Sequence, residues 1–361
     1  MPTGTNPRAN AIRRAHVAGQ REMAIYLRQL QQTIADIYRR AGEILQAEII
    51  RAGNAEGIIG IDQLGNLRRT VDDTLDQVRS ATENQLDQSL NRMVELGINP
   101  FQSEDIGTPV AQLTEQVLRN LRAFTDSNGL QLSDRLWRVD TALRRAVQES
   151  IETAVAEGQS ASQATRDFLT RGEVIPPDII SKRERAAAQA IAVQNLNRMD
   201  GGKEYRKVLQ VMQTESIRAH GMAHRAAATA HPDVVGVRFT LSPRHPEVDI
   251  CDVHASANIY GLGAGVYPPD RSPWPAHPNT FSFEQVVFRD EVTDEDRAGK
   301  QTRVDWLNAQ PDNIALPALG GTEAKLKAFR AGHVGERSIA TPWRALRERL
   351  ARQGIDVGRF E

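Results

Sequence analysis

The residues best suited to chemistry lie in one proline- and glycine-rich stretch that begins about two thirds of the way along the chain. Cys251 and His254 are spaced as C-x-x-H, and Cys251 is the only cysteine among 361 residues. Thiolate and imidazole ligands one turn apart can bind the same tetrahedral zinc ion, which needs four ligands. His277 is the best third candidate, and Asp249 or His245 is the fourth. The spacing therefore suggests a structural zinc site.

The same residues have a simpler interpretation. A lone cysteine often packs as a small buried side chain, and loop histidines often hydrogen-bond to backbone carbonyls that no sheet satisfies. Because the sequence holds no second cysteine, the second half of the usual zinc motif is missing. We therefore expect no obligatory cofactor, with a structural zinc ion as the alternative.

Two further patterns resemble catalytic motifs but lack essential residues. His220 and His224 are four residues apart on an expected helix, as in zinc proteases, but Gly221 occupies the place of the catalytic glutamate. The segment 261–265 is glycine-rich but lacks the Lys-Ser/Thr pair of a phosphate-binding loop, so we expect a turn there. No Ser-His-Asp order or glycosidase-like carboxylate pair stands out, and we expect a protein that is not an enzyme.

Composition and charge narrow the classes of partner. The hydrophobic content of 40% is enough for a core, and the formal net charge of −1 gives no general attraction for nucleic acid or anionic membrane. One cysteine excludes an internal disulfide. No run approaches the roughly 18 apolar residues that span a bilayer, and the first 16 residues lack the apolar segment of a secretory signal. We therefore expect a soluble protein made in the cytosol.

Hydrophobic periodicity predicts that most of the chain is helical. The expected helices cover about 9–51, 66–96, 109–124, 133–158, 162–172, 177–199, 204–230, 293–308 and 322–331, with a last helix beginning at 342. In the first helix, a heptad seam contains Met23, Leu27, Leu30, Ile34, Ile37, Ala41 and Ile44. Such a seam fits either an amphipathic helix packed within its own domain or an oligomeric coiled coil.

Two β-branched or aromatic stretches, 234–241 and 283–288, predict strands on either side of the Cys/His segment. The expected fold class is mainly α with a small α+β domain. The run Val174-Ile175-Pro176-Pro177 cannot be helical and indicates a domain boundary. We expect an N-terminal helical arm or bundle at 1–175, a compact Pro/Gly-rich unit with short strands at 176–335, and a helical tail at 336–361.

Short motifs follow one another in a fixed order between about residues 200 and 335. They are Thr214-Glu215 with Arg218, His245-Pro246, Asp249, Cys251-Asp252, His254, the glycine-rich turn, Tyr267-Pro268-Pro269, Pro275-Ala276-His277-Pro278-Asn279, Asp305-Trp306-Leu307, Gln310-Pro311, Leu319-Gly320 and Phe329-Arg330-Ala331-Gly332. This order resembles the phage Mu F-like minor head proteins, also called phage head morphogenesis proteins. Members of that family often end the central motif as H-P-x-C-x-C, whereas Thr280 and Ser282 replace both cysteines here.

The resemblance implies a minor structural protein of a tailed-phage head, made in the host cytoplasm and present in several copies per virion. Its implied partner is the portal protein, with the major capsid or scaffold proteins as further partners. It would assist head assembly, with DNA packaging or ejection as a further implied role, with DNA contact secondary and no membrane contact. Two alternatives remain: a metal-dependent enzyme, either a nuclease or ADP-ribosyltransferase-like, and a plain helical adaptor.

Overall fold

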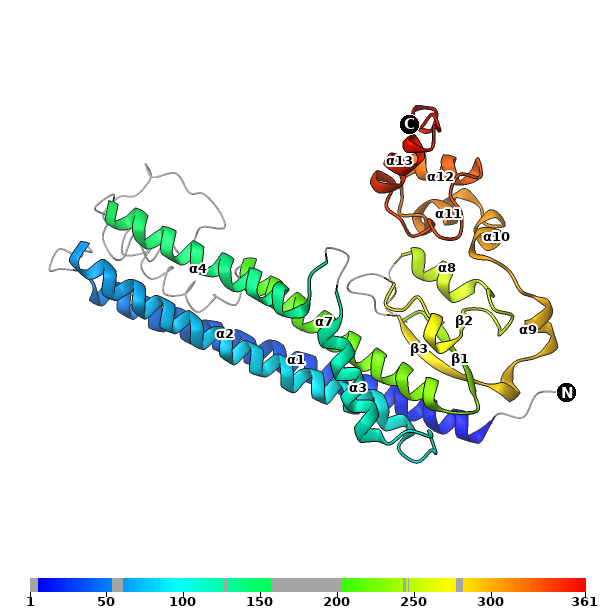
Figure 1. The fold of residues 1–361 in the computed structure, drawn as a ribbon, viewed down its shortest axis with the longest axis horizontal. Helices are drawn as coiled ribbons and strands as arrows, with labels where there is room; N and C mark the ends of the chain where they lie inside the picture. Colours follow the sequence, from blue (N-terminus) through cyan, green and yellow to red (C-terminus); the bar gives the residue numbers. More distant parts are fainter. Residues whose placement is uncertain are drawn as a thin grey trace. The chain divides into compact units, whose positions relative to one another are not determined.

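The computed structural model describes residues 6–53, 61–125, 129–156, 203–242, 245, 247–276 and 282–361 (Figure 1). The first part contains α1 (Pro7–Arg51), α2 (Ile61–Ile98), η1 (Asn99–Phe101), α3 (Val110–Ala123), α4 (Leu132–Ala156) and α7 (Lys203–Ala230). The second contains β1 (Val234–Thr240), α8 (Ile250–Ser256), β2 (Val266–Tyr267), η3 (Pro269–Arg271), β3 (Phe283–Phe288), η4 (Arg289–Glu291), α9 (Asp294–Ala298), α10 (Arg303–Asn308), α11 (Asp312–Ala318), α12 (Glu323–Arg330), α13 (Trp343–Arg352) and η5 (Gly358–Phe360). The predicted class, mainly α with a small α+β part, is confirmed.

The chain forms two compact units, each built from separate stretches of sequence. We call Met1–Arg21, Val94–Val117 and Arg218–Glu361 the sheet unit, and Glu22–Met93 with Leu118–Ile217 the helix unit. The predicted boundary near residue 175 and the predicted helices at 162–172 and 177–199 lie outside the described residues. The division into 1–175, 176–335 and 336–361 therefore stays a prediction.

In the helix unit, one face of α1 is buried by the chain's own residues. The buried α1 side chains are Leu30, Ile34, Tyr38, Ala41, Leu45 and Ile49. Their steps of four, four, three, four and four are longer on average than the alternating steps of four and three in a heptad seam, so the buried stripe departs from the predicted one. The predicted seam is therefore wrong at its end, because Ile44 is 45% exposed and Leu45 is buried instead.

Among the polar contacts inside the helix unit are two that involve buried side chains of α7. The Arg135 Nη1 atom donates to Glu215 Oε1 at 2.6 Å, and the Glu215 side chain is fully buried. The hydroxyls of Ser89 and Ser216 are 2.7 Å apart and also buried. Both contacts join residues far apart in sequence, so they help to specify which helices pack together.

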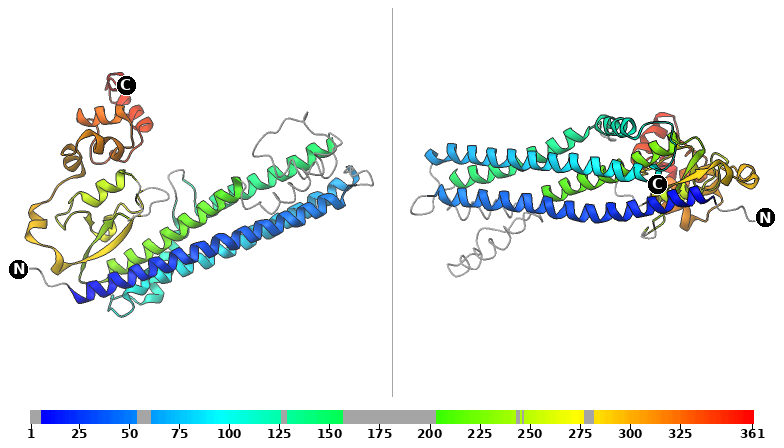
Figure 2. Two further views of the ribbon diagram at one scale, coloured as in Figure 1. Left: turned by 180° about the vertical axis from the view of Figure 1, so that it is seen from behind. Right: turned by 90° about the horizontal axis from the view of Figure 1, so that it is seen from below.

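The sheet unit contains one antiparallel sheet in the order β2-β1-β3. The central strand pairs Val237 with Tyr267 on β2 and Arg238 with Gln285 on β3. Helix α8 lies over one face of this sheet, while the adjoining parts of α1 and α7 lie against the other (Figures 1 and 2). Strands β1 and β3 were predicted. Strand β2, which has only two residues and follows the predicted glycine-rich turn, was not predicted.

The short C-terminal helices pack around a core that includes Val253 from α8. Its other buried members are Leu307, Ala315, Ala318, Leu319, Leu326, Ala328, Phe329, Val334, Ile339, Leu346, Leu350 and Phe360. The single helix predicted at 293–308 is wrong, because two helices occupy this segment. Thr293 begins α9 and Thr302 begins α10, each with a complete capping box, and Gly299 ends the first helix.

A buried ion pair joins α7 to β3 inside the sheet unit. The Arg225 guanidinium donates to Glu284 Oε2 through Nη2 at 2.9 Å and through Nε at 3.1 Å, and to the Trp274 carbonyl at 2.7 Å. The Glu284 side chain is only 2% exposed. Burial raises the Glu284 pKa, although Arg225 opposes that effect. The indole of Trp274 occupies the space that a side chain at Gly221 would need.

We expect Arg225→Leu to lower the free energy of unfolding by roughly 3–5 kcal/mol, because it leaves Glu284 buried without its partner. Arg225→Leu combined with Glu284→Gln should recover part of the loss, since no unpaired charge remains. Urea unfolding of both variants measures this coupling. Arg297→Leu, which removes an exposed pair with Asp294, is the control and should change little. A loss from Arg225→Leu no larger than the control's would contradict the prediction.

Two glycines of α2 provide a matched test of close helix packing. A side chain at Gly97 would overlap the His220 carbonyl and lie 2.7 Å from the Ala223 methyl, whereas Gly65 is exposed with open space around it. We expect Gly97→Ala to destabilise by roughly 1–3 kcal/mol through overpacking. Gly65→Ala should stabilise by about 0.5–1 kcal/mol, because alanine favours helix. Thermal and urea unfolding compare the two, and equal effects would show that α2 does not approach α7 closely at Gly97.

Candidate metal centre and the buried histidines

Helix α8 carries the predicted Cys/His motif and begins with a capping box. The Asp249 side chain accepts a hydrogen bond from the Cys251 backbone N–H at 2.6 Å, and Asp252 Oδ2 accepts one from the Asp249 N–H at 2.8 Å. These bonds satisfy backbone donors that the first turn of a helix leaves free. This helix was not predicted from the sequence. The signal was present in the spacing of the two aspartates, three residues apart.

The side chains of Cys251 and His254 are both buried. The His254 ring lies beside the rings of Phe239 on β1 and Tyr267 on β2, with centroid distances of 5.6 and 6.4 Å. The Tyr267 hydroxyl donates to the His254 carbonyl at 3.0 Å. Burial raises the Tyr267 pKa, so the phenol stays protonated and can serve as this donor. The His254 ring therefore packs against aromatic side chains of the sheet.

A different set of ligand atoms converges at the start of α8. His245 Nε2 is 2.9 Å from Asp252 Oδ2 and 3.7 Å from Asp249 Oδ1. Within the described parts of the chain, His245, Asp249 and Asp252 form the one group of three whose ligand atoms all lie within 4.8 Å of one another. An imidazole nitrogen with two carboxylate oxygens suits a divalent ion such as Zn²⁺ or Mn²⁺.

Of the four predicted zinc ligands, Asp249 thus lies with His245 and Asp252. Cys251 and His254 lie on the same helix but do not join this group. His277 falls outside the described residues, so the predicted set of Cys251, His254, His277 and Asp249 stays a prediction. Asp252 was noted in the sequence only as a nearby acid. Its role depends on α8, which places it one turn beyond Asp249.

His220 and His224 do lie on one helix, as predicted, and both are buried. The structure adds His16 from α1, whose ring centroid is 3.8 Å from that of His224 and 5.3 Å from that of His220. The i, i+4 spacing on α7 was visible in the sequence. No local signal indicated that His16 packs against it.

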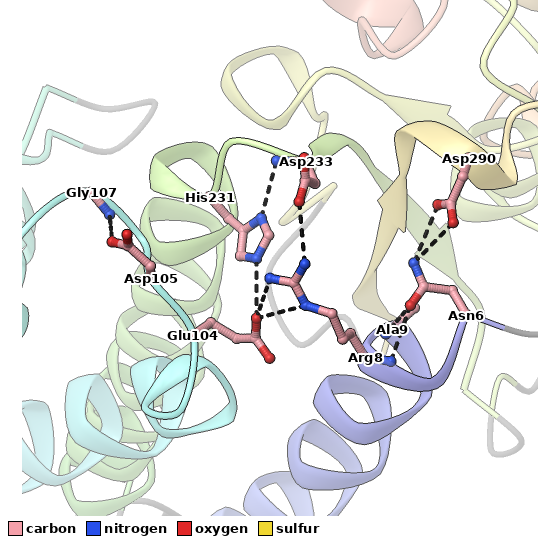
Figure 3. Close-up of polar contacts among 9 residues, drawn as sticks. All are labelled: Asn6, Arg8, Ala9, Glu104, Asp105, Gly107, His231, Asp233 and Asp290. Atoms are coloured by element: carbon pink, nitrogen blue, oxygen red, sulfur yellow. Dashed lines mark hydrogen bonds and ion pairs between the residues drawn. The ribbon is translucent and has the colours of Figure 1, made fainter.

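A separate polar network holds the first turn of α1 (Figure 3). The Arg8 guanidinium lies 2.6 Å from Glu104 Oε2 and 3.4 Å from Asp233 Oδ2. The Asp233 N–H donates to His231 Nδ1 at 3.1 Å, so the ring proton is on Nε2, which faces Glu104 at 3.5 Å. Hydrogen bonding to Arg8 lowers the Glu104 pKa. Because each charged group in this network already has a partner, we interpret the network as structural.

Comparisons with known proteins found no matching family model, no matching curated protein and no matching solved structure. Among the described helices, none combines the length and apolar character required to cross a membrane.

We expect Cys251→Ala to cost roughly 1–2 kcal/mol of stability, as for the loss of one small buried group. Val253→Ala, on the same helix and equally buried, is the matched control and should cost a similar amount. Urea unfolding with and without EDTA, together with elemental analysis of the purified protein, tests this expectation. Stoichiometric zinc, or unfolding on chelation, would instead establish the metal site.

Proposed function

We propose that this protein is a minor head protein of a tailed bacteriophage, a non-enzymatic structural component that binds the portal and assists head assembly. One observation carries the proposal. Three residues of the later motifs, Leu307, Leu319 and Phe329, share a single core with Val253, which lies between the motif residues Asp252 and His254 on α8. The described motifs from Cys251 to Gly332 therefore belong to one folded unit, as expected if they mark a domain rather than chance matches, whereas Thr214 and Glu215 lie in the helix unit.

The helix unit supports a role in binding another protein. Large apolar side chains are exposed on its helices, among them Ile25, Ile44 and Ile50 on α1 and Trp137 on α4. Ile44 also lines a groove between α1 and α2 together with Ile37, Ala41, Val78 and Ala81. Exposed aromatic and aliphatic side chains beside a groove are typical of protein–protein contacts. With a formal net charge of −1, the chain is better suited to a protein partner than to DNA.

The proposed partners are the portal protein first and the major capsid or scaffold proteins second, with several copies of this chain in each virion head. A metal-dependent nuclease is the second candidate function, favoured by the single group of His245, Asp249 and Asp252. A nuclease would need a further acid, base or anion-binding residue beside that group.

Co-purification with the portal protein encoded alongside tests the proposal. We expect the full chain to bind at a fixed ratio and to be present in purified particles by mass spectrometry. Replacing Ile44 and Trp137 together by serine should weaken binding at least tenfold, about 1.4 kcal/mol, because apolar contact is lost. Val110→Ser, at another exposed apolar position, is the control and should bind normally.

Two results would count against this role. Failure of the full chain to bind the portal, combined with its absence from particles, would contradict a head protein. Mn²⁺-dependent DNA cleavage that is lost in His245→Ala would favour the nuclease.

A further inference from the structure

Three buried imidazoles pack together inside the sheet unit, and we call His16, His220 and His224 the histidine cluster. His16 comes from α1 and the other two from α7. The His16 and His224 rings stack with centroids 3.8 Å apart and planes tilted by 38°, and Phe101 lies 5.2 Å from His224. All three side chains are at most 3% exposed. The cluster therefore belongs to the core between the two helices.

The hydrogen bonding indicates that these rings are neutral. The Gln20 side-chain nitrogen can only donate, so His16 Nε2, 3.0 Å away, accepts and the ring proton lies on Nδ1. His16 Nδ1, His220 Nε2 and both ring nitrogens of His224 lack a well-aligned hydrogen bond to any described residue. Burial lowers the pKa of His220 to about 4 and that of His224 to about 3, and it holds the pKa of His16 well below its usual value.

Among the described residues, no acidic side chain acts on these rings as a counter-charge. From α7, the nearby Arg225 carries the same sign as an imidazolium and is already paired with Glu284. From α2, the Gly97 carbonyl favours protonation of His224, but burial outweighs it. Phe101 and Phe283 contribute aromatic rings. A proton added to one ring therefore lies near the other rings, Arg225 and apolar groups. The charged ring can then be stabilised only by hydration.

Metal binding does not account for the cluster. Ligands of a tetrahedral ion direct their nitrogens at one point, whereas the His16 and His224 rings stack. Within the described chain, three ligand atoms converge to within 4.8 Å only at His245, Asp249 and Asp252. The cluster is thus a set of neutral rings held by packing.

The helices around the cluster approach one another closely. A side chain at Gly19 of α1 would lie 3.2 Å from the Leu96 carbonyl of α2, and one at Gly97 would overlap the His220 carbonyl of α7. Hydrating a charged ring therefore requires α1 and α7 to separate locally. The start of α1 has other anchors, because Arg8 is paired with Glu104 and Arg13 with Glu291.

We propose that the histidine cluster is an acid-operated latch, which holds α1 against α7 at neutral pH and opens locally when its rings take up protons. The carboxylate pairs of Arg8 and Arg13 keep the first turns of α1 attached while the cluster opens. The closed and open forms bind protons at different pH, which sets the direction of the pH dependence. The histidines of the open form bind protons near pH 6.5, and those of the closed form only at lower pH. The closed form is therefore fully populated above pH 6.5 and is lost as the pH falls.

Hydrogen–deuterium exchange of the full chain between pH 7.5 and 5 tests the latch. After correction for intrinsic exchange rates, opening around His16, His220 and His224 should increase about thirtyfold for each ring that is neutral when closed. Replacing all three by leucine should abolish this increase, and His333→Leu, outside the cluster, should behave as wild type. The change should reverse on return to pH 7.5.

Exchange near the cluster that stays constant with pH, or rises equally in the leucine variant, would overturn the proposal. If the triple variant does not fold, NMR titration of the histidine rings in the wild-type protein takes the place of that comparison. The latch requires three rings that remain neutral at pH 7 and become protonated together with local opening. Rings that titrate near pH 6.5 with no change in exchange would equally overturn it.

Discussion

The buried ion pair between Arg225 and Glu284 is the interaction on which the sheet unit depends. A carboxylate that is 2% exposed is stable only if a partner and hydrogen bonds compensate for its lost hydration. Arg225 supplies both and also bonds to the Trp274 carbonyl, so α7, β3 and the segment between β2 and β3 are held in one arrangement. Trp274 then fills the space beside Gly221, one residue from the histidine cluster.

Environment, more than residue type, distinguishes the histidines of this chain. His245 lies beside two carboxylates and is partly exposed, which suits a divalent ion. His254 packs between aromatic rings and contributes its carbonyl to Tyr267. The rings of the histidine cluster are buried and have no carboxylate partner among the described residues, so protonating them costs packing. The types and spacing of these histidines in the sequence could not have distinguished the three environments.

The proposed head-assembly role and the latch rest on different parts of the chain. The role is supported by motif residues that share the core around Val253 and by exposed apolar side chains in the helix unit. The latch depends on rings within the sheet unit and holds for any function of the protein. A local opening that responds to acid would let the first part of α1 change its packing without unfolding the sheet, because the ion pairs of Arg8 and Arg13 are separate from the cluster.

The sequence by itself determined the long helices and the two longer strands, because periodicity, caps and Gly/Pro breaks are local. The helix predicted at 204–230 is α7 at Lys203–Ala230, and the strand predicted at 283–288 is β3. His245 and Asp249 were proposed from the sequence as alternatives for one ligand position, and the structure places both beside Asp252. Only the tertiary structure decided that Leu45 rather than Ile44 is buried, that His16 stacks on His224 and that Glu284 pairs with Arg225. These depend on which helix faces meet, and packing between distant segments leaves no local pattern in the chain.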